Sequence, residues 1–238
     1  MDWERIDAIL FDLDGVLTPT ADVHMAAWNR MFNSYFEENG ISPAFTDEDY
    51  HAYVDGKPRY DGVRSLLASR GVELPEGDPS DPPGVETVCG LGNTKNEAFN
   101  QVLRDEGVAA YPGSVAFLDW VMGKGVAVAI VSSSRNADAI LRAAGLRDRF
   151  EVIVDGVLAA DLGLAGKPAP NTFLHAARQL GVAPERAVVV EDAVSGVAAG
   201  RAGDFGLVLG VDRGAGAEAL RASGADVVVS DLGELVPQ

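Results

Sequence analysis

The 238-residue chain has a formal net charge of −17 at pH 7, with 36 Asp and Glu residues against 19 Lys and Arg residues. This balance argues against a nucleic-acid scaffold, because neutralising a phosphate backbone needs clustered basic residues. The length and the 47% of hydrophobic residues are those of an ordinary globular protein with one good-sized core and room for a smaller partner domain.

The segments that usually mark a membrane or secreted protein are not found in the sequence. No apolar run approaches the roughly 20 residues that span a bilayer. Residues 1–5 are mixed and acidic, unlike a secretory signal. The single cysteine, Cys89, excludes an internal disulfide and is typical of a reducing compartment. We therefore expect a soluble, cytoplasmic protein without a membrane partner.

Short apolar runs rich in Val, Ile and Ala alternate with helical patterns along most of the chain. The runs predict buried parallel strands over residues 8–11, 126–131, 187–190, 207–209 and 226–229. The helical patterns cover residues 114–122, 136–144, 170–180 and 195–202, and several are followed by glycine, which commonly ends a helix. This alternation predicts an α/β fold with a doubly wound parallel sheet.

Residues 20–108 break the alternation. Helical patterns over 23–38, 60–70 and 93–106 have no strong strand runs between them, and residues 74–84 form a loop rich in Pro, Gly and acid. We therefore expect a helical domain over residues 20–108, inserted into a core built from residues 1–19 and 109–238.

Polar residues follow the predicted strands, and in such a sheet ligands bind at the carboxyl ends of the strands. Asp12 and Asp14 follow the first strand, residues 132–135 follow the second, and Glu191 and Asp192 follow the third. The carboxylates could hold a hard cation such as Mg²⁺. One aspartate could then attack a phosphate while the other transfers protons, with Lys167 balancing charge and Ser132 donating a hydrogen bond.

Each of these residues also has an ordinary explanation. Acidic residues and serines after a strand often cap helices or turns, and Lys167 before a proline is common on a surface. Four such groups, three of them at the ends of predicted strands, favour a catalytic site. No histidine has a partner at ligand spacing, so we expect no zinc site.

Four segments resemble, in order, the four motifs of the haloacid dehalogenase superfamily. They are FDLDGVL at 11–17, VSSS at 131–134, GKPAP at 166–170 and VVVEDAVSG at 188–196. The resemblance implies a Rossmann-like core with an inserted all-helical cap and an aspartyl-phosphate at Asp12. It also implies Mg²⁺ held by Asp12, the backbone carbonyl of Asp14 and Asp192, with Glu191 assisting.

Within the superfamily, residues 18–20 followed by His24 and Trp28 resemble the β-phosphoglucomutase-like subfamily. Arg59 and Lys95 match its cap positions for a second phosphate. These residues also have ordinary explanations. His24 could be a core or surface histidine, Arg59 and Lys95 could lie on a solvated helix face, and Trp28 could be a core residue. The resemblance further implies that His24 couples cap closure to Asp14, and that a core-side phosphate and the substrate are held by Ser134, Arg135 and Asn136.

The resemblance implies a monomer that acts on a small phosphorylated sugar, interconverting β-glucose 1-phosphate and glucose 6-phosphate through the 1,6-bisphosphate. A sugar-phosphate phosphatase would use the same core with water as the acceptor. A non-catalytic binding protein on this fold should lack part of the catalytic set, yet the sequence contains Asp12, Asp14, Lys167 and Asp192.

Overall fold

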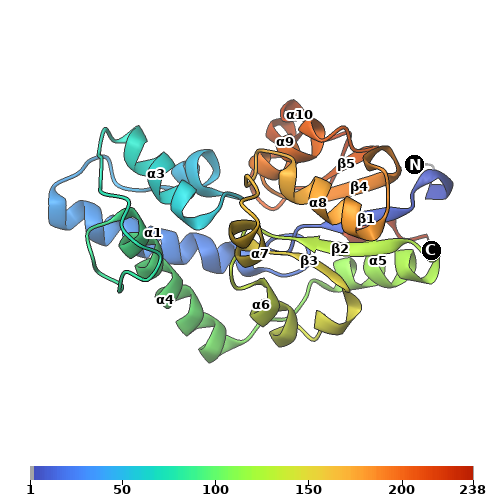
Figure 1. The fold of residues 1–238 in the computed structure, drawn as a ribbon, viewed down its shortest axis with the longest axis horizontal. Coiled ribbons are helices and arrows are strands. Elements are labelled where there is room, and N and C mark those ends of the chain that lie inside the picture. Colours follow the sequence, from blue (N-terminus) through green and yellow to red (C-terminus); the bar gives the residue numbers. More distant parts are fainter. Residues whose placement is uncertain (1–2, 238) are drawn as a thin grey trace. The chain divides into compact units, whose positions relative to one another are not determined.

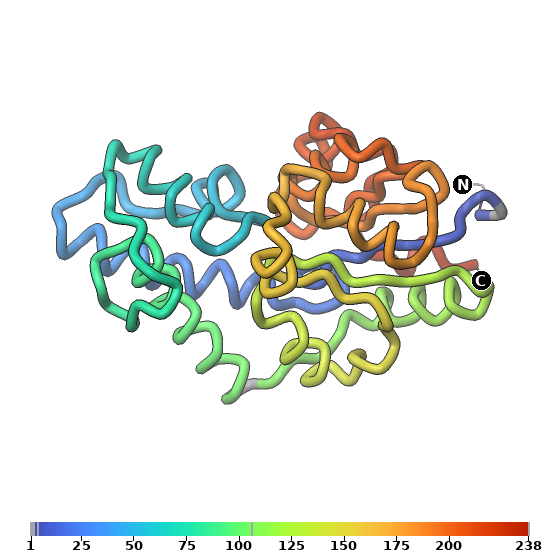
Figure 2. The backbone as a smooth tube through the Cα atoms, viewed as in Figure 1, coloured from blue at the N-terminus to red at the C-terminus, as the bar shows by residue number. Residues whose placement is uncertain are grey.

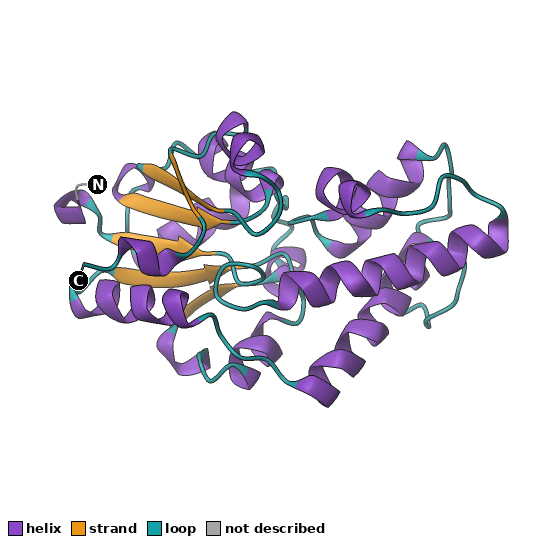
Figure 3. Cartoon of the chain, turned by 180° about the vertical axis from the view of Figure 1, so that it is seen from behind, coloured by secondary structure: helices purple, strands orange, loops and turns teal. Residues whose placement is uncertain are grey.

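The computed structural model describes residues 3–237, and the chain divides into two compact units. The first unit comprises Met1–Pro19 and Val108–Gln238, and the second is Thr20–Gly107. Figure 3 colours the elements and shows that the strands belong to the first unit, whereas the second is built from helices and loops.

The first unit contains a six-stranded sheet in the order β3-β2-β1-β4-β5-β6, in which every neighbouring pair is parallel. β1 lies between β2 and β4, as Figures 1 and 2 show, although these segments are far apart in the sequence. The strands are β1 (Ala8–Phe11), β2 (Ala127–Val131), β3 (Val152–Val154), β4 (Ala187–Glu191), β5 (Leu207–Val211) and β6 (Val227–Val229).

Alternate side chains of the central strand pack against helices on opposite faces of the sheet. Leu10 belongs to a buried cluster with Phe173 of helix α8 (Asn171–Leu180). Phe11 points to the other face, where its ring centroid lies 6.1 Å from that of Phe117 in helix α5 (Pro112–Gly123). Helices therefore cover both faces, which confirms the predicted doubly wound fold.

Three short elements of the first unit were not predicted from the sequence: strand β3, helix α7 (Gly156–Asp161) and helix α10 (Ala217–Ala222). Each is too short to show a full hydrophobic period. α7 begins where the Asp155 side chain accepts hydrogen bonds from the N–H groups of Val157 and Leu158. The remaining helices are α6 (Ala137–Ala143) and α9 (Val194–Ala202), with short 3-10 turns at Trp3–Arg5, Arg147–Arg149, Pro184–Arg186 and Leu232–Leu235.

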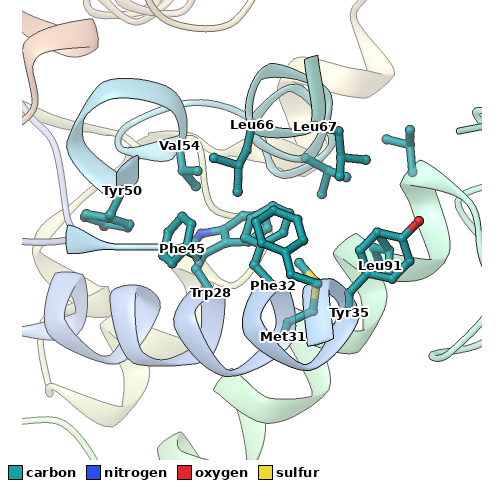
Figure 4. Close-up of a cluster of buried hydrophobic side chains, with 13 residues drawn as sticks. Trp28, Met31, Phe32, Tyr35, Phe45, Tyr50, Val54, Leu66, Leu67 and Leu91 are labelled. Atoms are coloured by element: carbon teal, nitrogen blue, oxygen red, sulfur yellow. The ribbon is translucent and has the colours of Figure 1, made fainter. Parts of the chain in front are cut away.

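The second unit has no strand between residues 20 and 107, a range whose backbone is described throughout, so the all-helical prediction is confirmed. Its elements are α1 (Thr20–Asn39), α2 (Asp47–Asp49), a π-helical turn (Tyr50–Val54), α3 (Arg59–Ser69) and α4 (Val88–Glu106). An aromatic and aliphatic cluster that includes Trp28, Phe32 and Leu66 forms its core (Figure 4). α4 begins earlier than the predicted residue 93, because the Thr87 side chain caps it by accepting from the Gly90 N–H.

Within residues 3–237, no helix combines the length and the apolar character that crossing a membrane requires.

Candidate active site

The candidate site lies at the carboxyl ends of the three central strands of the first unit. Strand order reverses at β1, whose neighbours are β2 and β4, and such switch points are where open α/β sheets bind ligands. Asp12 follows β1, Ser132 follows β2, and Glu191 ends β4 with Asp192 next to it. All four side chains are buried, so the fold brings together the groups that the sequence placed at separate strand ends.

Lys167 is the cation at the centre of this site, although it comes from the loop before α8. Its Nζ lies 2.5 Å from Asp12 Oδ1 and 2.6 Å from Glu191 Oε1. It also donates to the Val131 carbonyl at 2.9 Å. The lysine side chain is 1% exposed, and its Nζ lies 5.0 Å from the centroid of the Phe173 ring. A surface lysine, the alternative explanation, does not describe this residue.

Burial and charge set the protonation of this pair. Burial raises the pKa of the Asp12 carboxyl well above its ordinary value, the Lys167 ammonium opposes that rise, and the carboxylates of Glu191 and Asp14 add to it. Burial alone would lower the pKa of Lys167, but the carboxylates of Asp12 and Glu191 raise it above its ordinary value. Lys167 therefore stays charged at neutral pH and compensates the buried carboxylates.

The carboxylates of Asp12, Glu191 and Asp192 form a buried acidic cluster, with one oxygen from each within 4.8 Å of the others. Gly15 allows this approach, since a Cβ at that position would lie 1.8 Å from Asp192 Oδ2. Gly15 also has a φ of 85°, which favours glycine.

Glu191 has a second set of contacts besides Lys167. Its Oε2 accepts hydrogen bonds from the N–H groups of Asp192 and Ala193, both at 3.0 Å. Gly196 on α9 leaves space for the carboxylate, because a Cβ there would lie 1.7 Å from Glu191 Oε1. Gly196, the last residue of the fourth motif, therefore lies directly against a site carboxylate.

Asp14 lies at the edge of the buried cluster and is half-buried. Ser132 Oγ donates to Asp14 Oδ2 at 3.4 Å and accepts from the Ser134 N–H at 3.0 Å. Ser134 Oγ in turn accepts from the Asn136 N–H at 3.1 Å. Ser134 and Asn136 are half-buried in this turn, and the Arg135 side chain is exposed.

The second unit contains the four other candidates, and three of them meet. Lys95 Nζ contacts His24 Nδ1, and it lies 5.0 Å from the centroid of the Trp28 ring and 5.1 Å from that of Phe99. His24 stacks on Phe99 with centroids 4.0 Å apart. Lys95 is 4% exposed, so the alternative of a solvated helix face is wrong for this residue. Trp28 lies in the hydrophobic core of the second unit (Figure 4), which agrees with the alternative of a core tryptophan.

Arg59 is held by amide groups of α4. Its guanidinium donates to Asn93 Oδ1 at 3.2 Å and to Asn96 Oδ1 at 2.7 Å. Tyr60 OH also donates to Asn93 Oδ1, at 3.1 Å. Amide oxygens orient the guanidinium without neutralising its charge.

Sequence reasoning missed Phe99, Asn93 and Asn96. A signal was available for Phe99, because Lys95 and Phe99 are four residues apart, as are His24 and Trp28, and this spacing places each pair on one helix face. No pattern indicated Asn93 or Asn96, whose partner Arg59 is more than thirty residues away.

A lysine-bound aspartate lies at the switch point of this parallel sheet, and the comparisons with known proteins identify an enzyme of the phosphotransferase type. The sequence profile described as haloacid dehalogenase-like hydrolase matches residues 6–204. A β-phosphoglucomutase from Mycobacterium tuberculosis (strain CDC 1551 / Oshkosh) is 52% identical over 98% of this chain and 92% of that protein. A fructose-1-phosphate phosphatase from Escherichia coli (strain K12) is 32% identical over 84% of this chain and 94% of that protein.

The crystal structure of β-phosphoglucomutase from Clostridium difficile has the same fold, with a TM-score of 0.77 and 25% identity over 97% of this chain and 93% of that chain. The chain belongs to the haloacid dehalogenase-like hydrolase family.

Proposed function

We propose that this enzyme forms an aspartyl-phosphate on Asp12 in the presence of Mg²⁺ and interconverts β-glucose 1-phosphate and glucose 6-phosphate through the 1,6-bisphosphate. The observation that carries the phosphoryl-transfer proposal is the buried Asp12 carboxylate, fixed 2.5 Å from the Lys167 ammonium at the end of the central strand. The 52% identity to a β-phosphoglucomutase supports the choice of substrate.

The residues present fit a magnesium ion. Mg²⁺ takes oxygen ligands at about 2.1 Å, so two of its ligands lie roughly 3–4 Å apart. Carboxylate oxygens of the acidic cluster lie within 4.8 Å of one another, close to that spacing. In our proposal Asp12 and Asp192 supply carboxylate ligands and Asp14 its backbone carbonyl, while Glu191 assists by holding Lys167. The ion would reduce the repulsion between a carboxylate nucleophile and a phosphate dianion.

Replacing Gly15 with alanine should weaken Mg²⁺ binding by at least about tenfold, because the new methyl group would displace Asp192. Isothermal titration calorimetry with MgCl₂ measures this loss. Gly125→Ala is the matched control, since its φ is 76° and a Cβ there has no neighbour within 4 Å. Equal Mg²⁺ affinity in the two variants would show that Asp192 is not a ligand.

The chemistry divides between two aspartates. A carboxylate oxygen of Asp12 forms the bond to phosphorus while the bond from phosphorus to the sugar oxygen breaks, and Asp14 gives that oxygen a proton. In the reverse half-reaction a sugar hydroxyl attacks the aspartyl-phosphate and Asp14 takes its proton. Lys167 fixes the Asp12 carboxylate and compensates negative charge, and Ser132 orients Asp14 through the 3.4 Å hydrogen bond.

A mutase must also hold the phosphate that is not reacting, since its bisphosphate intermediate turns around between the two half-reactions. We assign this task to Arg59, because a guanidinium offers two parallel donors to a phosphate. In this proposal Asn93 and Asn96 set the plane of the guanidinium. Lys95 is the other proposed contact of this second phosphate, and His24, which Lys95 touches, couples cap closure to Asp14. Ser134, Arg135 and Asn136 contact the phosphate and substrate on the core side.

A sugar-phosphate phosphatase is the second candidate, and the 32% identity to a fructose-1-phosphate phosphatase favours keeping it. Hydrolysis would use the same Asp12 and Asp14, with water in place of the sugar hydroxyl. The two functions differ in how fast water attacks the aspartyl-phosphate.

A coupled assay tests the proposal. The enzyme is given Mg²⁺, β-glucose 1-phosphate and a trace of the 1,6-bisphosphate, while glucose 6-phosphate and free phosphate are followed together. We expect glucose 6-phosphate in large excess over phosphate. Phosphate release without isomerisation would move the function to hydrolysis, and no turnover of either kind would contradict this substrate.

Arg59→Ala should lower mutase turnover by about 10²-fold or more, because a misplaced distal phosphate loses the alignment of the reacting atoms. Hydrolysis of a small aryl phosphate, which has no second phosphate, should change less than about threefold. Arg64→Ala on the same helix is the control, since Arg64 is exposed and pairs with Asp61 and Glu76. Equal losses of both activities in Arg59→Ala would instead give Arg59 a role in the fold.

A further inference from the structure

Residues 12–18 form a compact loop after β1 that carries both catalytic aspartates. Inside the loop, the Leu17 and Thr18 N–H groups donate to the Leu13 carbonyl at 3.0 and 3.1 Å, and the Gly15 N–H donates to the Thr18 carbonyl at 2.7 Å. Within the loop, the carbonyls of Leu13 and Thr18 are therefore the acceptors. The carbonyls of Gly15, Val16 and Leu17 accept hydrogen bonds from residues outside the loop.

Three donors from distant parts of the first unit hold these three successive carbonyls. The Arg213 Nε donates to the Gly15 carbonyl at 3.1 Å. Ser114 Oγ, which is fully buried, donates to the Val16 carbonyl at 2.6 Å. The Tyr111 N–H donates to the Leu17 carbonyl at 2.9 Å. We call Tyr111, Ser114 and Arg213 the carbonyl clamp.

Arg213 is itself fixed on the side away from the loop. Its other nitrogens donate to the Ser230 carbonyl at 2.9 Å and to Asp231 Oδ2 at 3.4 Å. Its guanidinium carbon lies 3.9 Å from the centroid of the Tyr111 ring, a stacking geometry that favours arginine over lysine. The planar group therefore has little freedom to turn away from Gly15.

The peptide that Arg213 holds adjoins the proposed metal site. Gly15 sits between the Asp14 carbonyl, a proposed Mg²⁺ ligand, and the carbonyl that Arg213 holds, and the Asp192 carboxylate lies directly against its Cα. Glycine has the widest backbone freedom of any residue. A bond to its carbonyl oxygen restricts the rotation that would move the Asp14 carbonyl away from Asp192.

We propose that Arg213, supported by Ser114, is a positioning residue for the Mg²⁺ site, which it acts on through the Gly15 peptide without touching the ion or the substrate. This inference rests on the proposed Mg²⁺ dependence. Groups that orient metal ligands from outside commonly change metal affinity by 10–100-fold when they are removed. A purely structural arginine would change the stability of the protein and leave its Mg²⁺ affinity unchanged.

Calorimetric titration of the metal-stripped full-length protein with MgCl₂ tests this role. R213M should bind Mg²⁺ about tenfold more weakly than the unmodified protein, and S114A, a smaller change, should weaken binding in the same direction. R201M is the matched control. Arg201 also donates to a glycine carbonyl, that of Gly224, and pairs with an aspartate, Asp226, but it holds no residue of the catalytic loop.

The outcomes separate this inference from the proposed function. Weaker Mg²⁺ binding in R213M and S114A, with the affinity of R201M unchanged, supports the positioning role. Unchanged affinity in both clamp variants overturns it while the proposed function stands. If R213M fails to fold, the S114A titration decides alone. Absence of Mg²⁺ binding by the unmodified protein would overturn the proposed metal dependence and this inference with it.

Discussion

Replacing Asp12 with asparagine is expected to lower turnover by roughly four orders of magnitude or more. The amide is a poor nucleophile and cannot form the acyl-phosphate, and removing a nucleophile leaves only the rate that binding and charge stabilisation provide. The fold should be kept, because asparagine has nearly the volume of aspartate and its amide oxygen can accept from Lys167. The coupled assay gives the rate, and circular dichroism checks the fold.

Asp7→Asn provides the control for this substitution. Asp7 comes directly before β1, whereas Asp12 comes directly after it. At that opposite end of the strand, Asp7 forms an ion pair with Arg186. Turnover in Asp7→Asn should stay within about twofold of the unmodified enzyme, since surface ion pairs contribute little. Retained turnover in Asp12→Asn would remove Asp12 from the role of nucleophile.

Replacing Lys167 with methionine is expected to cost both activity and stability. The substitution leaves the buried carboxylates of Asp12 and Glu191 without their cation. Removing one partner of a buried ion pair typically costs about 3–5 kcal/mol of the free energy of unfolding. Urea unfolding at pH 7 measures the loss, and Lys124→Met, at an exposed lysine that lies over Trp120, should show almost none.

The stability loss in Lys167→Met should depend on pH. Burial already raises the pKa of Asp12, and Lys167 is the group that opposes the rise. Without it the folded-state pKa climbs further above the unfolded value, so the ionised carboxyl opposes folding. Protonation relieves that penalty as pH falls. The difference in unfolding free energy from the unmodified protein should therefore be larger at pH 7.5 than at pH 5. A pH-independent difference would mean that lost packing, and not charge, causes it.

The central sheet and its acidic groups could be predicted because buried parallel strands have a recognisable sequence pattern, a nearly continuous run of apolar residues. The segments around β1, β2 and β4 are almost wholly apolar and end abruptly in charged or hydroxyl residues, so both the strand and its ligand-binding end are visible. The edge strand β3 has three residues, two of them half-buried. A segment of that length and exposure gives no periodic signal, and its position follows from pairing with β2.

Contacts between distant segments were outside the reach of sequence patterns. Lysine is usually a surface residue, yet Lys95 is buried, contacts His24 and lies close to the rings of Trp28 and Phe99. Arg213 follows β5 and meets Gly15 across almost two hundred residues. Nothing local distinguishes it from the exposed arginines of the chain, because its role depends on where the loop after β5 passes the catalytic loop.

Trapping the phosphorylated enzyme tests the central claim most directly. The protein is mixed with Mg²⁺ and glucose 1,6-bisphosphate, quenched in acid and reduced with borohydride, which converts an aspartyl-phosphate into homoserine. Peptide sequencing then locates the modified residue. We predict homoserine at position 12 and none in Asp12→Asn. Homoserine at another aspartate, or phosphoryl transfer from the bisphosphate with no trapped residue, would contradict an aspartyl-phosphate at Asp12.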